Sequence, residues 1–277
     1  MSRNLRVFVT GAGSGLGRAI ALHYAKQGAR VACTDRDLPS VNDTLAQVVK
    51  AGGGGLAFAL DVTSEDDFIA AAERLQSEWK GVDVVINNAG VATAGNIDAA
   101  PMSDWEWVVN INLFGVVRGC KAFAPMLKAQ RSGHVVNIAS FAGIANPPGM
   151  GSYNASKAGV VAVSETLRHE LAEFGVGVTV VCPAFFPTNL MNSARVMESG
   201  TVGMVHKFMK KSGVTADDVA AQIARAVSKK EFLVLTHKDT RTQALAKRIS
   251  PEYFFKMVQK TRKRLTPKKA RTSPSAF

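Results

Sequence analysis

Short apolar runs alternate with longer amphipathic stretches along most of this chain. The runs hold four to six residues each and are rich in valine, isoleucine and leucine, as expected for strands buried on both faces. They lie at residues 5–9, 30–34, 56–60, 82–86, 134–139, 176–181 and 232–235. The amphipathic stretches predict helices near residues 40–50, 65–79, 102–130, 152–174 and 215–229. This alternation predicts an α/β fold, with a doubly wound, mostly parallel sheet and helices on both of its faces.

The first predicted strand runs directly into a glycine-rich turn. The turn reads Thr10-Gly11-Ala12-Gly13-Ser14-Gly15-Leu16-Gly17, and a helical pattern follows it. Glycines allow a sharp turn and a close approach of the backbone to a pyrophosphate, while free amides at a helix N-terminus attract its charge. The succession of strand, turn and helix predicts a dinucleotide site with the candidate contacts Gly11, Ser14, Gly15, Leu16 and Gly17. A plain tight turn is the alternative interpretation.

An acidic residue ends the next predicted strand. Asp35 follows the glycines by about 20 residues, where a carboxylate can accept hydrogen bonds from an adenosine ribose. This spacing supports the dinucleotide interpretation. A carboxylate at this position also repels a 2′-phosphate, so NAD is favoured over NADP as the cofactor. The adjacent Arg36 could reach such a phosphate and compensate in part, which keeps NADP as the alternative.

A tyrosine and a lysine stand four residues apart on a predicted helix. Tyr153 and Lys157 therefore project from the same helix face. An unperturbed phenol has a pKa of about 10, and an ammonium group one turn away lowers that pKa by favouring the phenolate. Ser140 places a hydroxyl at the end of a predicted strand, just before this helix. Alone, the pair also fits a solvated helix face, but the dinucleotide context favours general acid–base chemistry.

These motifs occur together and in one order along the chain. The segments are Thr10–Gly17, Asp61-Val62, Asn87-Asn88-Ala89-Gly90, Asn112, Ser140, Tyr153-Asn154-Ala155-Ser156-Lys157 and Pro183. Over residues 5–190 the chain resembles the short-chain dehydrogenase/reductase family, in its single-domain branch. The resemblance implies a Rossmann-type fold and hydride transfer between a nicotinamide and an alcohol or carbonyl.

The resemblance also implies roles for individual residues. The catalytic set falls on Asn112, Ser140, Tyr153 and Lys157. Ser140 would hold the substrate oxygen and Tyr153 would exchange the proton. Lys157 would lower the tyrosine pKa and bind the nicotinamide ribose, while the Asn112 amide would anchor a water that relays protons. Asn110 is the neighbouring alternative, and either asparagine also fits a packing role that distorts the helix. Further cofactor contacts are Asp61, Val62, Asn88, Ala89, Gly90, Pro183 and Thr188.

The loop after the sixth long strand departs from the family pattern and leads into the substrate region. Ala184 follows Pro183 where family members commonly have glycine. Residues 187–214 match the position of a mobile lid in the family, and with the preceding loop they carry the apolar residues Phe185, Phe186, Leu190, Met191, Val196, Met197, Val202, Met204, Val205, Phe208 and Met209. Such residues make an adaptable apolar surface, which favours a bulky, apolar secondary alcohol or ketone as substrate. Ordinary packing of a lid helix is the alternative.

Positive charge is concentrated at the C-terminal end. The net charge is +12, and residues 241–277 contribute +10 of it, with eleven Lys or Arg and one acid. Residues 250–265 predict a basic amphipathic helix with the apolar face Phe254, Met257, Val258, Thr261 and Leu265. Such a helix suits an anionic membrane surface, and packing on the core or on a neighbouring subunit is an equal alternative. Nucleic acid is disfavoured as a partner because no recognised binding fold accompanies the charge.

Composition sets further limits. With 47% hydrophobic residues the chain can bury a full core, so one catalytic domain over 1–240 is expected, followed by an extension over 241–277 with a disordered end. The absence of a spanning apolar run and of room for a signal peptide favours a cytoplasmic protein, with peripheral membrane association as an option. Cys33, Cys120 and Cys182 fit buried thiols, and no metal site is visible. Gly52–Gly55 is expected to form a flexible turn.

The leading prediction is an NAD-dependent alcohol dehydrogenase or ketoreductase with a small-molecule substrate, and the resemblance implies a homodimer or homotetramer. A nucleotide-sugar epimerase or dehydratase is a weaker prediction, since such enzymes carry a larger C-terminal substrate domain. A non-enzymatic alternative is an NAD-binding regulatory protein that its basic tail recruits to a membrane. The set of Ser140, Tyr153 and Lys157 argues against it, because a pure binder does not need all three.

Overall fold

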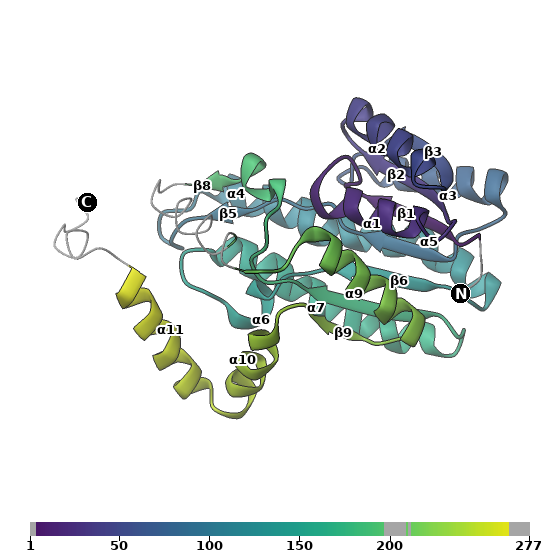
Figure 1. Ribbon diagram of the computed structural model, residues 1–277. Helices are drawn as coiled ribbons and strands as arrows, with labels where there is room; N and C mark the ends of the chain where they lie inside the picture. The colour runs from purple at the N-terminus through teal and green to yellow at the C-terminus, as the bar shows by residue number, and fades with distance from the viewer. Residues whose placement is uncertain (1–3, 197–208, 210–211, 266–277) are drawn as a thin grey trace.

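A seven-stranded parallel sheet runs through the centre of the molecule (Figure 1). The computed structural model describes residues 4–196, 209 and 212–265. The strand order is β3-β2-β1-β4-β6-β7-β9, with the bounds β1 (Arg6–Thr10), β2 (Arg30–Asp35), β3 (Gly54–Ala59), β4 (Val84–Asn87), β6 (His134–Ile138), β7 (Gly177–Cys182) and β9 (Leu233–Leu235). The predicted doubly wound α/β sheet is confirmed. From β1 the chain builds the sheet outward in one direction through β2 and β3, and from β4 it builds in the other direction. Such sheets have a ligand crevice at this point, at the carboxyl ends of the strands.

Helices cover both faces of this sheet because its strands are apolar on both faces. One face carries α1 (Gly15–Ala25), α2 (Leu38–Lys50) and α9 (Ala216–Lys229), and the other carries α3 (Glu65–Trp79), α5 (Gly115–Gln130) and α7 (Gly151–Ala172). Within β1, Val7 and Val9 pack into the first layer and Phe8 into the second. The ring of Phe8 lies 4.5 Å from that of Phe123 in α5, measured between centroids. One strand thus stabilises two helical layers.

Shorter elements surround the sheet. They are the paired strands β5 (Thr93–Ala94) and β8 (Arg195–Val196), and the helices α4 (Met102–Val109), η1 (Asn110–Phe114), α6 (Ala142–Ala145), η2 (Asn189–Ser193), α10 (Lys238–Ile249) and α11 (Pro251–Leu265). The sequence analysis does not predict β5, β8, α6 or α10, since short or mainly polar segments carry a weak periodic signal. The helix predicted over 250–265 is present as α11.

The glycine run at 52–55 is only partly a turn. Gly52 lies in a turn with Ala51 after α2, but β3 already begins at Gly54. Gly55 has φ +155°, and a methyl group on it would overlap the carbonyl group of Val31 in β2. The expectation of a turn through all four glycines is therefore wrong, because the last two belong to β3, and Gly55 allows this strand to lie close beside β2.

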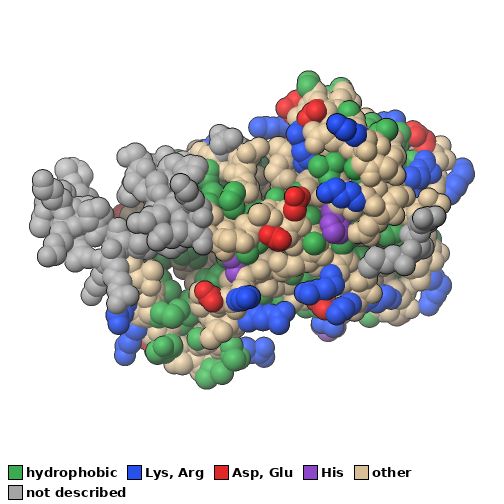
Figure 2. Space-filling view, viewed as in Figure 1, with side chains coloured by type: hydrophobic (Ala, Val, Ile, Leu, Met, Phe, Trp, Pro, Cys, Tyr) green, Lys and Arg blue, Asp and Glu red, His purple; other side chains and the backbone are tan. Residues whose placement is uncertain are grey.

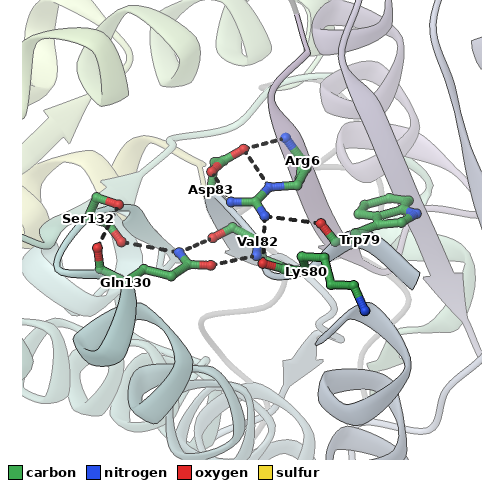
Figure 3. A network of polar contacts seen from close by, with 7 residues as sticks. All are labelled: Arg6, Trp79, Lys80, Val82, Asp83, Gln130 and Ser132. Carbon is green, nitrogen blue, oxygen red and sulfur yellow. Dashed lines mark hydrogen bonds and ion pairs between the residues drawn. The ribbon is translucent and has the colours of Figure 1, made fainter. Parts of the chain in front are cut away.

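A charged pair joins the amino ends of β1 and β4 (Figure 3). The Asp83 carboxylate accepts from the backbone amide of Arg6 at 2.8 Å and from its guanidinium at 2.6 and 3.0 Å. The guanidinium also donates to two carbonyl groups at the end of α3. Beside this pair, the Gln130 side chain bonds both backbone polar groups of Val82. Because Arg6 and Asp83 are 77 residues apart in sequence, their pairing helps to fix β1 beside β4.

A buried histidine lies at the start of β6. His134 is 3% exposed, and its Nε2 lies 2.7 Å from Thr179 Oγ1. The Thr179 hydroxyl donates its hydrogen to the Glu231 carbonyl oxygen, so it accepts from the imidazole, and Nε2 carries the hydrogen of a neutral ring. Burial, assisted by the charge of Lys230, lowers the pKa of His134 to about 4.

We expect acid to destabilise the fold through His134. The pKa of this side chain in the unfolded chain is about 6.5, so between roughly pH 6.5 and pH 4 the unfolded state binds a proton that the native state does not. The free energy of unfolding should therefore fall as the pH falls, by up to about 1.4 kcal/mol per pH unit. In denaturant titrations across this range, His134→Gln should show a smaller slope than the wild type. An equal pH dependence of the unfolding free energy in the wild type and the variant would contradict the lowered pKa of His134.

Candidate active site

The glycine-rich turn brings separate parts of the backbone into close contact. Gly11 has φ +66° and Gly15 has φ +52°, values that glycine adopts without strain. A methyl group at Gly17 would overlap the Gly11 carbonyl oxygen and lie 2.6 Å from Asn88 Nδ2. A methyl group at Gly11 would lie 2.8 Å from Ala89 Cα. The turn therefore packs against α1 and the loop after β4 only with glycine at these positions.

The start of α1 fits a bound anion. No acidic residue lies in its first turn, and the hydroxyl of Ser14 at the N-cap makes no capping hydrogen bond. The first amides of the helix therefore lack this side-chain acceptor and, with the helix dipole, attract negative charge. Arg18 braces the turn, since its guanidinium donates to the Gly13 carbonyl and, at 3.0 Å, to Thr44 Oγ1. This arrangement fits the pyrophosphate of a dinucleotide.

Asp35 lies at the end of β2, beside this turn. Its carboxylate accepts from the Gly13 amide at 3.3 Å and from the Asp37 amide at 3.2 Å. A methyl group on Gly13 would overlap the Ser40 hydroxyl, which would have to move, and would lie 3.1 Å from the carboxylate. Asp35 and Arg36 line the same cavity as the glycines. The carboxylate thus lies where the sequence predicts an adenosine ribose.

The loop after β4 is tied to the glycine turn by a threonine. Thr10 Oγ1 accepts from the amides of Asn88 and Ala89 at 2.9 and 3.1 Å. In return, Asn88 Nδ2 donates to the Thr10 carbonyl at 2.8 Å. Asn88, Ala89 and Gly90 are thereby held beside the turn. The sequence analysis did not give Thr10 a role, although a hydroxyl at the end of a strand that precedes a glycine turn is a signal that could have been used.

Asn112 serves as a brace for the same loop. It is fully buried in η1, a single turn of π-helix inside the predicted helix 102–130. Its Oδ1 accepts from the Val91 amide at 2.8 Å, and its Nδ2 donates to the Val91 carbonyl at 2.9 Å and to Ser156 Oγ at 3.2 Å. Both amide hydrogens are therefore used within the protein, which leaves only an oxygen lone pair for the predicted water. Asn110, the alternative, accepts from Arg118 instead.

Ser140, Tyr153 and Lys157 come together at the carboxyl end of β6. The hydroxyl of Ser140 accepts from the Ala142 amide at 3.1 Å and donates to the Pro183 carbonyl at 3.4 Å, and it lies near enough to the phenol of Tyr153 to lower the pKa of that group. Tyr153 and Lys157 lie on one face of α7 and are 6% and 4% exposed. A solvated helix face, the alternative interpretation of this pair, is therefore wrong.

The pKa shifts of the pair differ from the expectation. Burial raises the pKa of Tyr153, and the hydrogen bond with Ser140 lowers it by a smaller amount. Lys157 does not contribute to this shift, and its Nζ donates to the Ile138 carbonyl at 2.9 Å. Burial lowers the pKa of Lys157 itself to about 8. The direction of the shift is therefore opposite to the predicted lowering of the tyrosine pKa, because burial is the largest of its causes.

One cavity of about 1650 Å³ connects these parts. Pockets for a single drug-sized ligand hold roughly 300–1,000 Å³, so this cavity has room for a dinucleotide together with a second molecule. Of the four catalytic candidates, the fully buried Asn112 does not line it, but Ser140, Tyr153 and Lys157 do. So do all the other predicted cofactor contacts, namely Gly11, Ser14, Gly15, Leu16, Gly17, Asp35, Arg36, Asp61, Val62, Asn88, Ala89, Gly90, Pro183 and Thr188.

Some of these side chains are already bonded within their own loops. Asp61 Oδ1 accepts from the amide and the hydroxyl of Thr63, both at 2.8 Å. Thr188 Oγ1 accepts from the Leu190 amide at 3.1 Å and caps η2. Ala184, which replaces the glycine common in the family, does not have a positive φ. The loop after β7 therefore accepts alanine without backbone strain.

The C-terminal helix α11 lines the far end of the cavity with Phe254, Met257, Val258 and Thr261. The apolar face predicted to meet a lipid surface is therefore turned inward, as the alternative of packing toward the core expects. From the predicted lid, Leu190, Met191 and Met209 also line the cavity. Lid residues 197–208 and the expected disordered end, 268–277, lie outside the described residues.

Comparison with known proteins identifies the family. A family model described as short chain dehydrogenase matches residues 6–199. The chain belongs to the short-chain dehydrogenase/reductase family. The resemblance found in the sequence is thus confirmed.

Relatives within the short-chain dehydrogenase/reductase family differ in length. The probable oxidoreductase EphD of Mycobacterium tuberculosis is 37% identical over 234 residues, which cover 81% of this chain and 40% of EphD. The chain thus spans about two fifths of that relative. A CLA biosynthesis dehydrogenase/reductase of Lactiplantibacillus plantarum is 31% identical over 251 residues, covering 84% and 88% of the two chains. The crystal structure of a family member from Burkholderia phymatum in complex with NAD is similar with a TM-score of 0.85 and 31% identity, over 91% of this chain and 95% of that one.

Other predicted features concern cysteines, metals and membranes. Burial raises the pKa of Cys33, Cys120 and Cys182 to about 12, as expected for buried thiols. Within the described ranges, no group of three or more His, Cys, Asp or Glu side chains could hold a metal ion. In the same part of the chain, no helix combines the length and the apolar character that crossing a bilayer requires.

We expect the contact between the turn and α1 to be essential for cofactor binding. Gly17→Ala would push a methyl group into the Gly11 carbonyl, and overpacking of this kind costs about 1–3 kcal/mol. The variant should show a lower unfolding temperature and much weaker NAD binding in calorimetry. Gly54→Ala is the matched control, because no atom lies within 4 Å of its added methyl group. Wild-type NAD affinity in Gly17→Ala would contradict the proposed cradle.

Proposed function

We propose that this protein transfers a hydride between NAD and a secondary alcohol or ketone, with Tyr153 as the general acid or base. The observation that carries the proposal is the single cavity that joins the glycine cradle and Asp35 to the buried Ser140, Tyr153 and Lys157. Bound NAD would supply the hydride acceptor, or NADH the donor. The pyrophosphate would lie over Gly11, Gly15 and Gly17 at the start of α1.

In this proposal the protein's own residues hold the substrate oxygen and move its proton. The Ser140 hydroxyl, which donates to the Pro183 carbonyl in this structure, would instead donate to the substrate oxygen. Tyr153 would take the alcohol proton during oxidation and return it during reduction. Because burial raises the pKa of Tyr153, its phenolate needs stabilisation. The Ser140 hydroxyl and a buried amine are the neighbouring groups that could supply it. Lys157 is the amine, on the next turn of α7.

We expect Tyr153→Phe to lose most turnover and to keep NAD binding. The variant retains the ring and loses only the hydroxyl that exchanges the proton, a contribution of about 10²–10⁴ in rate. Absorbance of the reduced nicotinamide would follow turnover, and calorimetry would follow NAD binding. Tyr253→Phe is the matched control, since that phenol is on α11 and its residue is 62% exposed. Near-wild-type turnover in Tyr153→Phe would exclude the assigned role. Full NAD binding without turnover on any alcohol or ketone would instead favour the regulatory alternative.

NAD is proposed as the preferred cofactor because of Asp35. Its carboxylate lines the cavity beside the glycine turn, where a 2′-phosphate of NADP would meet a like charge. The neighbouring Arg36, in the same lining, is the residue that could favour NADP.

Asp35→Asn should shift the cofactor preference. Removing the charge should raise the Michaelis constant for NAD and lower that for NADP, each by up to about tenfold, or ~1.4 kcal/mol. Asp98→Asn, which removes an exposed carboxylate outside the cavity lining, should change neither constant. A wild-type protein that prefers NADP would refute the assignment.

The substrate proposed is bulky and apolar. Phe185, Phe186, Leu190 and Met191 line the cavity near the catalytic residues, and they offer apolar contacts and little hydrogen bonding. The family's enzymes act on small molecules, and this lining supports apolar ones among them.

Further expectations stay proposals. A homodimer or homotetramer rests on the family resemblance. Association with an anionic membrane would now depend on the outer surface of α10 and α11, where apolar side chains are exposed among lysines and arginines (Figure 2). The exposed apolar residues there are Leu245, Ile249, Tyr253 and Phe255. A cytoplasmic location, with or without such peripheral association, remains a prediction from the sequence.

A further inference from the structure

The helix α11 has two different faces. Phe254, Met257, Val258 and Thr261 follow the spacing i, i+3, i+4, i+7 and line the cavity. The neighbouring Tyr253 and Phe255 do not line it and are 62% and 56% exposed. Phe254, between them, is 4% exposed. The helix thus presents one apolar face to the same space that contains Tyr153.

Among the described residues, this face lines a cavity and is only partly buried. An apolar helix face gains free energy when it is removed from water, at about 25 cal/mol for each Å² buried. Here Met257 and Val258 are only partly buried and lie at the wall of the cavity. The face therefore remains able to gain free energy from an apolar molecule placed against it. Leu190 and Met191 line the same cavity.

The helical pair α10–α11 is fixed to the segment that carries the catalytic serine. Lys247 in α10 donates to the carbonyl of Ile144 in α6, which follows Ser140 in the chain. The Asn146 amide, oriented to satisfy its neighbours, accepts from the same Nζ at 2.8 Å. Figure 1 shows α10 beside α6, with α11 leading away from it at the left. These bonds hold the inner face of α11 at a set position relative to Ser140 and Tyr153.

We infer that the inner face of α11 forms the distal part of the substrate site and selects ketones or alcohols with an extended apolar body. The reacting carbonyl or alcohol would lie at Ser140 and Tyr153. The apolar body would extend past the loop after β7 and end against Phe254, Met257 and Val258. This inference rests on the proposed hydride transfer and adds a specificity-determining element 100 residues beyond the catalytic tyrosine.

A series of methyl ketones from 2-butanone to 2-dodecanone, reduced with NADH by the full-length protein, tests this inference. In the wild type, kcat/KM should rise by about fourfold for each methylene that α11 covers, which corresponds to ~0.8 kcal/mol. Val258→Asp places a carboxylate at the apolar wall and should abolish this rise for the longer ketones. Met257→Ala, a milder change, should reduce the rise.

Phe255→Asp is the matched control. It adds the same charge to the same helix, three residues away but on the exposed face, and should keep the wild-type dependence on chain length. Equal kcat/KM across the ketones in the wild type, or the same series in Val258→Asp and Phe255→Asp, would overturn the inference and leave the proposed function intact.

A binding measurement separates the inference from the proposed function. Thermal stabilisation by 2-dodecanone in the presence of NADH should be present in the wild type and in Phe255→Asp and absent in Val258→Asp. That result without turnover of any ketone would retain the distal site and reject ketone reduction. Turnover of 2-butanone without stabilisation by 2-dodecanone would reject the distal site alone, and the absence of both would reject both.

Discussion

A close contact between two backbone segments underlies the whole site. The turn after β1 and the loop after β4 meet at Gly11 and Ala89, where a methyl group on the glycine would lie 2.8 Å from the alanine Cα. The Thr10 hydroxyl then joins the two segments through the amides of Asn88 and Ala89. Because β1 and β4 flank the point where the strand order turns back, this contact positions the cofactor cradle beside the crevice. The residues that follow β6 complete the site from the next strand.

Much of this arrangement could be predicted because it is encoded locally. All seven strands of the main sheet coincide with short apolar runs, since strands buried on both faces need such runs. The glycine-rich turn can be predicted from the sequence, because a positive φ and close backbone contact both favour glycine. Tyr153 and Lys157 could be paired from their spacing alone, as helical geometry places residues i and i+4 on one face.

Other features could not be predicted, for physical reasons. The pairing of Arg6 with Asp83, 77 residues apart, depends on the finished sheet. Asn112 donates both amide hydrogens, to Val91 and Ser156, and the hydrophobic periodicity of the sequence does not predict these partners. The predicted lowering of the Tyr153 pKa considers only the positive charge of Lys157 one helical turn away. It does not consider that both side chains are buried. Because both groups are buried, loss of solvent is the largest cause of both pKa shifts. It disfavours the charged form of each group, so it raises the pKa of the phenol and lowers the pKa of the amine.

The attachment of α10–α11 has an evolutionary consequence. This pair of helices supplies no strand to the main sheet as far as the chain is described, yet α11 lines the cavity. Amino-acid changes on its inner face can therefore alter which molecules are accepted without disturbing the cradle or the acid–base group. Evolution could change the substrate specificity of this fold by altering the α10–α11 segment, while the hydrogen bonds of Lys247 keep the segment attached to α6.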